Sequence, residues 1–398
     1  MPEETEETAP PSPATATPAP IQAGRPSPGA RHFNCLNCGS SLLYQPGSDF
    51  IVCPYCQTRN PIPAAENEAD YLKENDFLLT LEEEERKIAA QPEGPTLQTV
   101  TCPACGANTT VSEEHSADRC PYCGSPLSIQ NRQSVKLPVQ AVLPFQLDRQ
   151  KALAVYQAWI ASRWFAPGDF VRRSYRNEGL DGVYLPYWTF DADTITNYRG
   201  ERGDAYYETR VRRMMLNGKM ETRTEQVRLI RWTPVRGKVS VAFDDILITA
   251  STSLPGVLVN RLEPWDLSGL KPFQNEYLSG FVTNTYNVSL RDGFVTAQVR
   301  MEPVIEHAVL GDIGGDEQRI GDQDTRYNHV TFKHILLPVW LSAYAYGNRT
   351  YRFVINAQTG EVQGERPWSV WKIALTIITG LAAAGGLIYW LVQSGFFA

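Results

Sequence analysis

The sequence predicts an α+β protein in which a β-rich domain follows two small four-cysteine modules and precedes one membrane-spanning helix. All eight cysteines of the 398-residue chain lie in four Cys-x-x-Cys pairs. Runs of β-branched and aromatic residues separated by turn residues dominate the stretch 136–366. Residues 373–398 contain no charged side chain, which is the composition of a helix inside a bilayer.

The composition is that of a folded protein in a reducing compartment. With 42% hydrophobic and 20% charged residues, the chain can form at least one large core. Its formal net charge of −7 argues against bulk attraction to nucleic acid, which needs a basic face. No cysteine lies outside the paired motifs, as in intracellular metal-binding proteins. The first residues are polar and contain no apolar segment typical of a signal peptide. The Pro-rich segment 1–31 is predicted to be a disordered tail.

The cysteine modules, at 32–60 and 100–128, each predict a zinc ribbon. In both, two Cys-x-x-Cys pairs are separated by 14 residues. Each pair forms a tight knuckle that directs two thiolates at one metal, and two knuckles complete a tetrahedral site. The predicted ligands are Cys35, Cys38, Cys53, Cys56, Cys102, Cys105, Cys120 and Cys123. Four thiolates leave no open position, so the two Zn²⁺ ions are expected to be structural. A redox pair and an iron–sulfur site are less favoured alternatives.

The stretch 61–99 between the modules predicts a helical linker. Tyr71, Leu78, Leu81 and Ile88 fall on one helical face. A solvated connector is the favoured interpretation, and a partner-binding helix is the alternative.

The α+β domain, 136–366, begins with a predicted helix that Asp148 caps and that ends before Pro167-Gly168. The side chains expected on its buried side are Leu153, Tyr156, Ile160 and Trp164. Asn217-Gly218 predicts a hairpin between the strands 205–215 and 220–232. A three-strand meander is predicted at 341–346, 349–355 and 361–365.

A weak internal repeat suggests that this domain is a duplicated unit with halves 136–255 and 265–366. Pro144-Phe145 precedes Leu185-Pro186-Tyr187-Trp188, and Pro272-Phe273 precedes Leu337-Pro338-Val339-Trp340. Chance matches of this length are common, so a single unrepeated domain stays the alternative.

The C-terminal segment 372–393 predicts a single transmembrane helix. Trp368 and Trp371 flank one end and aromatic residues flank the other, as at bilayer interfaces. Arg366 and Lys372 precede the helix and no positive charge follows it. The positive-inside rule then places the N-terminal domains in the cytoplasm, on the inner membrane. A buried core helix is disfavoured by length and position. Small residues such as Gly380 and Ala384 leave homodimerisation open.

No sequence motif predicts catalysis, so we expect a protein that is not an enzyme. The chain has no phosphate-binding loop, nucleophile elbow or His-Glu-x-x-His helix. A polar stretch from Asp312 to His334 is expected to be a capped loop, with a metal site as the alternative. Its polar side chains are Asp312, Asp316, Asp322, Asp324, His329 and His334. Residues 199–238 hold eleven Lys/Arg against five Asp/Glu, either a solvated sheet edge or a face for lipid or nucleic acid.

Several long strings of the chain resemble a bacterial family of membrane-anchored double-zinc-ribbon proteins. They are the segments 162–167, 182–189, 231–234, 312–318, 331–334 and 356–364, and the resemblance spans about 33–372. Members are often labelled primosomal protein N′, superfamily II helicase-like or transcription-factor-IIB-type zinc ribbon. The resemblance implies no established activity, and it implies a link with envelope-stress and flotillin-type membrane systems.

Together these features favour a non-enzymatic adaptor that binds a protein partner at the cytoplasmic face of the membrane. The alternative is a membrane-tethered nucleic-acid-binding protein, related to replication or transcription, without helicase activity.

Overall fold

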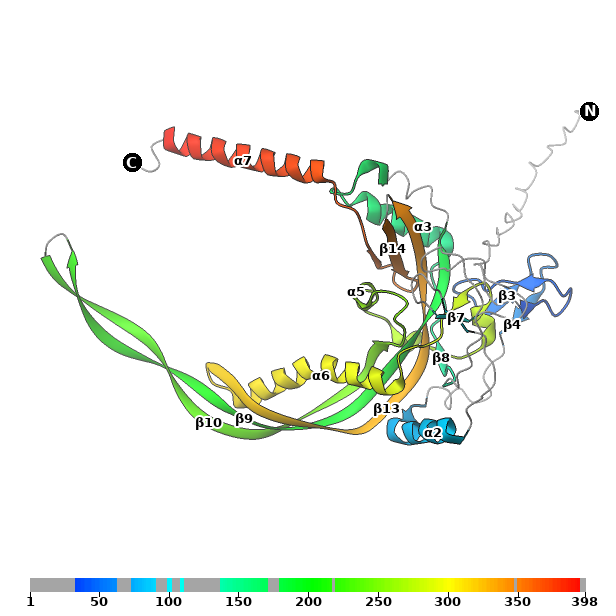
Figure 1. Cartoon of the computed structure of the whole chain (residues 1–398), viewed down its shortest axis with the longest axis horizontal. Helices are drawn as coiled ribbons and strands as arrows, with labels where there is room; N and C mark the ends of the chain where they lie inside the picture. The colour runs from blue at the N-terminus through cyan, green and yellow to red at the C-terminus, as the bar shows by residue number, and fades with distance from the viewer. Residues whose placement is uncertain are drawn as a thin grey trace, which may run out of the picture.

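The computed structural model describes residues 33–62, 73–90, 99–101, 108–110, 137–170, 179–216, 219–346 and 349–393. Its largest feature is a mixed sheet in the order β10-β9-β13-β14-β15, which curves strongly along its length (Figure 1). The mixed α and β character expected from the sequence is confirmed. The predicted N-terminal tail and the four cysteines of the second module lie outside the described residues.

Three strands of the sheet are very long. β9 (Asp181–Leu216) and β10 (Lys219–Thr249) form an antiparallel hairpin, and β13 (Glu317–Tyr346) pairs with the other edge of β9. The hairpin predicted at Asn217-Gly218 is confirmed, because Leu216 pairs with Lys219. Its strands extend far beyond the predicted runs.

Among the described residues, the outer part of this hairpin pairs with no third strand. β13 pairs with β9 only as far as Gly203, so residues 204–216 and 219–231 form a two-stranded arm. Figure 1 shows the arm projecting beyond the rest of the sheet. Most of the basic segment 199–238 lies on this arm.

The predicted meander is also confirmed. The end of β13 pairs with β14 (Arg349–Asn356), which pairs with β15 (Val362–Gly364). Short strands complete the sheet: β5 (Asn75–Asp76), β8 (Ala141–Val142), β11 (Lys271–Pro272) and β12 (Val282–Thr283).

Two long helices pack on the sheet, α3 against β14 and β15 and α6 against β10 and β9. α3 is Arg149–Ala161, capped by the Asp148 side chain as predicted, with Tyr156 and Ile160 buried. The prediction for Trp164 was wrong: α3 ends three residues earlier, and the Trp164 side chain is 72% exposed. α6 (Leu290–Ile313) lies along the inside of the curve (Figure 1). Its buried residues recur every three or four positions, as expected of a helix against a sheet.

The close approach of α6 to β9 requires a glycine. A Cβ built on Gly293 would lie 2.7 Å from Cδ1 of Trp188, a ring with no exposed surface. Glycine therefore lets the helix backbone reach the sheet at this point.

The two Leu-Pro-x-Trp segments meet at the centre of the sheet, where Leu185 pairs with Leu337 in antiparallel register. β8 runs parallel to β13, and β12 runs parallel to β9 in the equivalent place. Each short strand is followed by a capped helix, α3 after Asp148 and α6 after Ser289. The strand, helix and long-strand order thus occurs twice, with two-fold symmetry in the strand order.

The second repeat begins at β12 and not at Pro272-Phe273. Pro272 lies in β11, which pairs antiparallel with β8 rather than occupying the place equivalent to β8. The dipeptide match with Pro144-Phe145 therefore does not relate equivalent positions.

The remaining helices are α2 (Phe77–Ala90), α5 (Gly256–Asn260), two 3₁₀ turns (Leu267–Gly269 and Asn275–Leu278) and α7 (Val370–Gln393). α2 follows β5, which pairs with the edge of β13. Phe77 packs on Phe190 and Phe294, and Glu85 forms a 2.7 Å ion pair with Arg291. Of the predicted apolar face, Leu81 is partly buried and Leu78 is 66% exposed, while Tyr71 and the side chain of Ile88 lie outside the described part of the chain.

Candidate metal centre

The first cysteine module is built from two hairpins, β1 (Phe33–Asn34) with β2 (Ser41–Leu42) and β3 (Phe50–Val52) with β4 (Arg59–Pro61). In the first knuckle, the Cys35 N–H donates to the Ser40 carbonyl (2.8 Å) and the Gly39 N–H donates to the Cys35 carbonyl (2.9 Å). The second knuckle repeats this pattern, with the Cys53 N–H donating to the Thr58 carbonyl at 2.9 Å. The backbone alone therefore directs both pairs of thiols to one point.

Both knuckles close through a residue in the left-handed region. Gly39 has φ 72°, where glycine has no steric cost. Gln57 occupies the equivalent position of the second knuckle with φ 60°, which costs an L residue about 1 kcal/mol. The requirement for this turn thus outweighs the local preference of Gln57.

The four sulfur atoms have the spacing of a tetrahedral thiolate site. The Sγ atoms of Cys35 and Cys56 are 3.6 Å apart, and those of Cys38 and Cys53 are 3.5 Å apart. All four lie within 4.8 Å of one another. Zinc–sulfur bonds of about 2.3 Å in a tetrahedron place the sulfurs about 3.8 Å apart. The residues therefore fit a zinc ion.

Asn60, in β4, links the two knuckles through hydrogen bonds to their backbone groups. Its side chain is 5% exposed, and its Oδ1 accepts a 2.9 Å hydrogen bond from the Leu36 N–H of the opposite knuckle. Its Nδ2 donates to the carbonyls of Ile51 (3.2 Å) and Thr58 (3.1 Å). No cysteine motif indicates this residue. The signal that could have found it is a polar side chain at the buried position of β4.

Hydroxyl groups surround the sulfurs. Ser40 Oγ lies 3.1 Å from the Sγ atoms of both Cys38 and Cys53. Cys56 Sγ lies 3.2 Å from Thr58 Oγ1, and its interactions with the Thr58 side chain and backbone lower the pKa of the Cys56 thiol to about 6. Both contacts favour the thiolate, which is the form that binds a metal ion.

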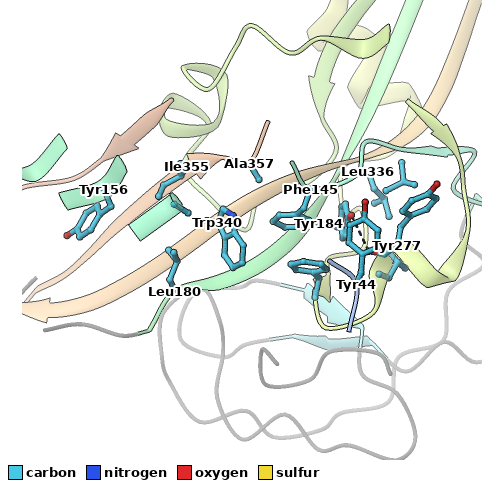
Figure 2. Packing of buried hydrophobic residues seen from close by; sticks show 14 of the residues in the cluster. Tyr44, Phe145, Tyr156, Leu180, Tyr184, Tyr277, Leu336, Trp340, Ile355 and Ala357 are labelled. Atoms are coloured by element: carbon cyan, nitrogen blue, oxygen red, sulfur yellow. Dashed lines mark hydrogen bonds between the residues drawn. The ribbon is translucent and has the colours of Figure 1, made fainter. Parts of the chain in front are cut away.

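The base of this module is part of the core of the large domain. Tyr44 packs edge-on against Tyr277, with ring centroids 5.4 Å apart, among the buried residues drawn in Figure 2. The Tyr44 N–H donates to the Ser279 carbonyl (3.1 Å), and Ser279 Oγ donates to the Leu42 carbonyl (2.6 Å). Burial raises the pKa of Tyr44, so the phenol stays neutral. The metal centre is therefore fixed relative to the sheet.

The tips of the knuckles point the other way, into solvent. Leu36 is 82% exposed and Tyr55 is 78% exposed, and each lies between the two cysteines of its pair. An apolar side chain held on a rigid knuckle is a favourable contact for another protein.

A second polar cluster joins the linker to the face of the sheet opposite α6. Lys333 Nζ lies 3.1 Å from both Glu74 Oε1 and Asp245 Oδ1. Thr331 Oγ1 donates to Glu74 Oε2 (2.7 Å), and Asp191 Oδ1 accepts a 2.5 Å hydrogen bond from the Asp245 N–H. The pairing of β10 with β9 shifts register between Phe243 and Ile246, and Asp245 lies at this shift, beside Asp191.

This cluster shares a proton near neutral pH. Burial and the neighbouring Glu74 carboxyl raise the pKa of Asp191 to about 7. Burial alone would raise the pKa of Glu74, but its hydrogen bonds with Asp191, Thr331 and Lys333 lower it. Asp191 therefore holds the proton that allows two carboxyl groups to lie in contact.

The polar side chains between Asp312 and His334 do not converge. Asp312 ends α6 and accepts a 2.6 Å hydrogen bond from the Tyr198 hydroxyl, while Asp316 accepts from the Ala205 N–H (2.7 Å). His334 is buried against Trp188. The expected loop is instead the end of a helix followed by a long strand, which spreads these groups along its length. In the described part of the chain, none of them belongs to a group of possible metal ligands.

α7 is long and apolar enough to cross a bilayer. Its stretch Val370–Trp390 has a mean hydropathy of 1.8 and is not buried in the rest of the protein. It begins two residues before the predicted start and ends as predicted, at Gln393.

The chain is similar to Uncharacterized protein YdjG of Bacillus subtilis (strain 168), with 27% identity over 247 residues, covering 62% of this chain and 69% of that protein. No protein-family profile matches the chain, and no solved structure matches it. Membership of the double-zinc-ribbon family therefore stays a prediction.

Proposed function

We propose that the protein is a membrane-anchored zinc-ribbon adaptor that binds a protein partner at the cytoplasmic face and catalyses no reaction. Zinc at Cys35, Cys38, Cys53 and Cys56 would be structural, because four thiolates leave no position for a substrate. The matching spacing of Cys102, Cys105, Cys120 and Cys123 supports a second ion. α7 would anchor the chain, with Arg366 and Lys372 on the cytoplasmic side.

The exposure of Leu36 and Tyr55 carries this proposal. Asn60 links the two knuckles, a bound zinc ion would hold them further, and both tips are displayed on a module whose base lies in the core. Such a surface can bind another protein without paying for ordering a loop.

Crosslinking in intact membranes, followed by affinity purification and mass spectrometry, tests the proposal. A Leu36→Ser/Tyr55→Ser variant is expected to lose a specific partner that the wild-type chain captures. The control is Val257→Ser/Val299→Ser, which replaces exposed apolar residues on α5 and α6 (65% and 62% exposed). If both variants capture the same proteins, the knuckle tips are not the binding surface. If no sample contains a specific partner, the adaptor function is contradicted.

A second candidate function is nucleic-acid binding by the arm. Residues 204–231 hold seven Lys/Arg against four Asp/Glu, in a chain whose net charge is −7. Some of this charge is internally neutralised, since Arg210 pairs with Glu208 (3.0 Å) and Arg228 with Glu317 (2.9 Å).

Salt-dependent binding of the detergent-solubilised chain to DNA or RNA tests this candidate. If the arm binds phosphates, Arg210→Gln/Arg212→Gln lowers the slope of log K against log salt by about one for each lost contact. The control is Arg261→Gln/Lys271→Gln, which removes equal charge from exposed positions elsewhere. Equal slopes, or no binding at low salt, would exclude the arm.

A further inference from the structure

Aromatic and basic side chains gather where α7 leaves the domain. Trp368 and Trp371 lie at the start of α7, and Trp164 and Phe165 come from the turn after α3, far away in sequence. The Phe165 and Trp368 rings have centroids 6.2 Å apart. Two distant segments therefore form one aromatic surface at the end of the helix.

Specific hydrogen bonds fix the turn to the helix. Lys372 Nζ donates to the carbonyls of Trp164 (2.9 Å) and Ala166 (2.8 Å). The Ser369 N–H donates to the Phe165 carbonyl at 2.8 Å. Lys372 thus satisfies carbonyls of the turn, so the turn keeps its place relative to α7.

The tryptophans of this surface face outward. Trp164 is 72% exposed, Trp368 58% and Trp371 86%. In water such exposure is costly, because each indole presents a large apolar surface. At the interface of a bilayer the same side chains are favourable, since the ring enters the apolar region and its N–H stays hydrated.

Three basic side chains lie in this surface, and acidic residues flank it at Asp169 and Glu365. Arg163, Arg366 and Lys372 lie within the stretches 162–168 and 366–374, which contain no Asp or Glu. Arg366 stacks over Trp368, with its Cζ 4.4 Å from the ring centroid. Cations beside indoles at a membrane surface attract anionic phospholipid headgroups.

We infer that the turn at 163–166 is a second membrane contact, with Trp164 inserted among the headgroups of the leaflet that α7 enters. This inference rests on the anchoring by α7 in the proposed function. It goes further, because a single helix does not set the orientation of the domain relative to the membrane. Two contacts hold the domain in one orientation at an anionic phospholipid surface.

Quenching of tryptophan emission by lipid tests the inference. The full-length chain is reconstituted in vesicles of phosphatidylcholine and phosphatidylglycerol whose acyl chains are brominated near the headgroup. Four exposed tryptophans would face lipid (164, 368, 371 and 390), so Trp164→Phe is expected to remove roughly a quarter of the lipid-quenchable emission. Trp265→Phe, a partly buried position beside Tyr187, leaves that emission unchanged.

Trp390→Phe, near the far end of α7, separates the two possible failures. If Trp390→Phe lowers the quenchable emission and Trp164→Phe does not, α7 is in the bilayer and the second contact is wrong. If neither variant lowers it, the anchoring by α7 is itself wrong, and with it the membrane part of the proposed function. A loss with Trp265→Phe equal to that with Trp164→Phe would also overturn the inference.

Discussion

Asn60 shows how much of the metal centre depends on a residue outside the cysteine pairs. Its amide hydrogen-bonds to the Leu36 N–H of the first knuckle and to the Thr58 carbonyl of the second, so it links the two pairs of cysteines. Cys35, Cys38, Cys53 and Cys56 were predictable from spacing alone, because a four-thiolate site needs that pattern. Asn60 was not, because its partners are backbone groups brought together only by the fold.

Replacing Asn60 with alanine is expected to weaken zinc binding. The change leaves the Leu36 N–H without its acceptor and loosens the hold on the first knuckle, as for other residues that orient metal ligands. We expect a 10- to 100-fold loss of zinc affinity, which corresponds to about 1.4–2.7 kcal/mol of binding free energy. Competition with a chromophoric chelator measures it.

Asn37→Ala is the matched control, since the Asn37 side chain is exposed and bonds only to the Thr58 hydroxyl in the described structure. It should change the affinity little. Equal losses in the two variants would mean that Asn60 has no special role.

Asp191 makes stability depend on pH. An acid whose pKa is raised on folding contributes stability at low pH, and this is lost as pH rises from about 4, its ordinary value, through about 7. Asp191→Asn imitates the protonated acid and keeps both polar atoms. Its unfolding free energy should therefore exceed that of the wild type at pH 8, by a margin that shrinks towards pH 5.

Urea unfolding of the zinc-loaded chain in detergent between pH 5 and 8 measures this margin. Asp244→Asn removes an exposed carboxyl that lies within 4.8 Å of the Asp191 carboxyl, and it should show a smaller pH dependence. A margin that is constant with pH for Asp191→Asn would contradict the shared proton.

At the scale of elements, sequence patterns predicted the positions of turns better than the lengths of strands and helices. Asn217-Gly218 and the final meander were correctly predicted, because turn residues report local conformation. The length of β9 and β10 was not, since alternation of polar and apolar residues fades in the exposed arm. The full length of α6 is not evident from the sequence, because Pro303 lies inside it and proline usually ends a helix.

Gly293→Ala and Gly311→Ala form a matched pair on α6. The new methyl of the first would meet the buried Trp188 ring, and we expect a loss of about 1–3 kcal/mol. The second has nothing within 4 Å of its Cβ position, so the better helix propensity of alanine should give a gain of up to about 1 kcal/mol. Thermal unfolding of both variants measures the difference, and changes of the same sign would contradict the packing of α6.

Removal of the arm is expected to leave the domain folded. A chain in which 206–229 are replaced by a short turn keeps the pairing of β9 with β13 up to Gly203. The arm has no third strand, so its deletion should shift the melting temperature by no more than a few degrees, as for a surface change of under about 1 kcal/mol. A large fall in melting temperature would show that the arm stabilises the sheet.

For the whole molecule, the sequence located the first cysteine module and the apolar helix but not their relation to the sheet. Tyr44 lies in the core beside Tyr277, so the first module packs against the large domain and is not an independent domain. Glu74 connects the linker to Lys333, and Lys372 connects the turn after α3 to α7. Such contacts join residues far apart in the chain, and no local pattern predicts them.

Metal content of the purified full-length chain tests the zinc-ribbon assignment most directly. Zinc measured by plasma emission against protein concentration is expected to be two equivalents in the wild type and one in a Cys53→Ser/Cys56→Ser variant, because each site needs all four thiolates. One equivalent in the wild type would contradict the second site. Iron in place of zinc, or wild-type zinc content in the double variant, would contradict the metal centre at Cys35, Cys38, Cys53 and Cys56.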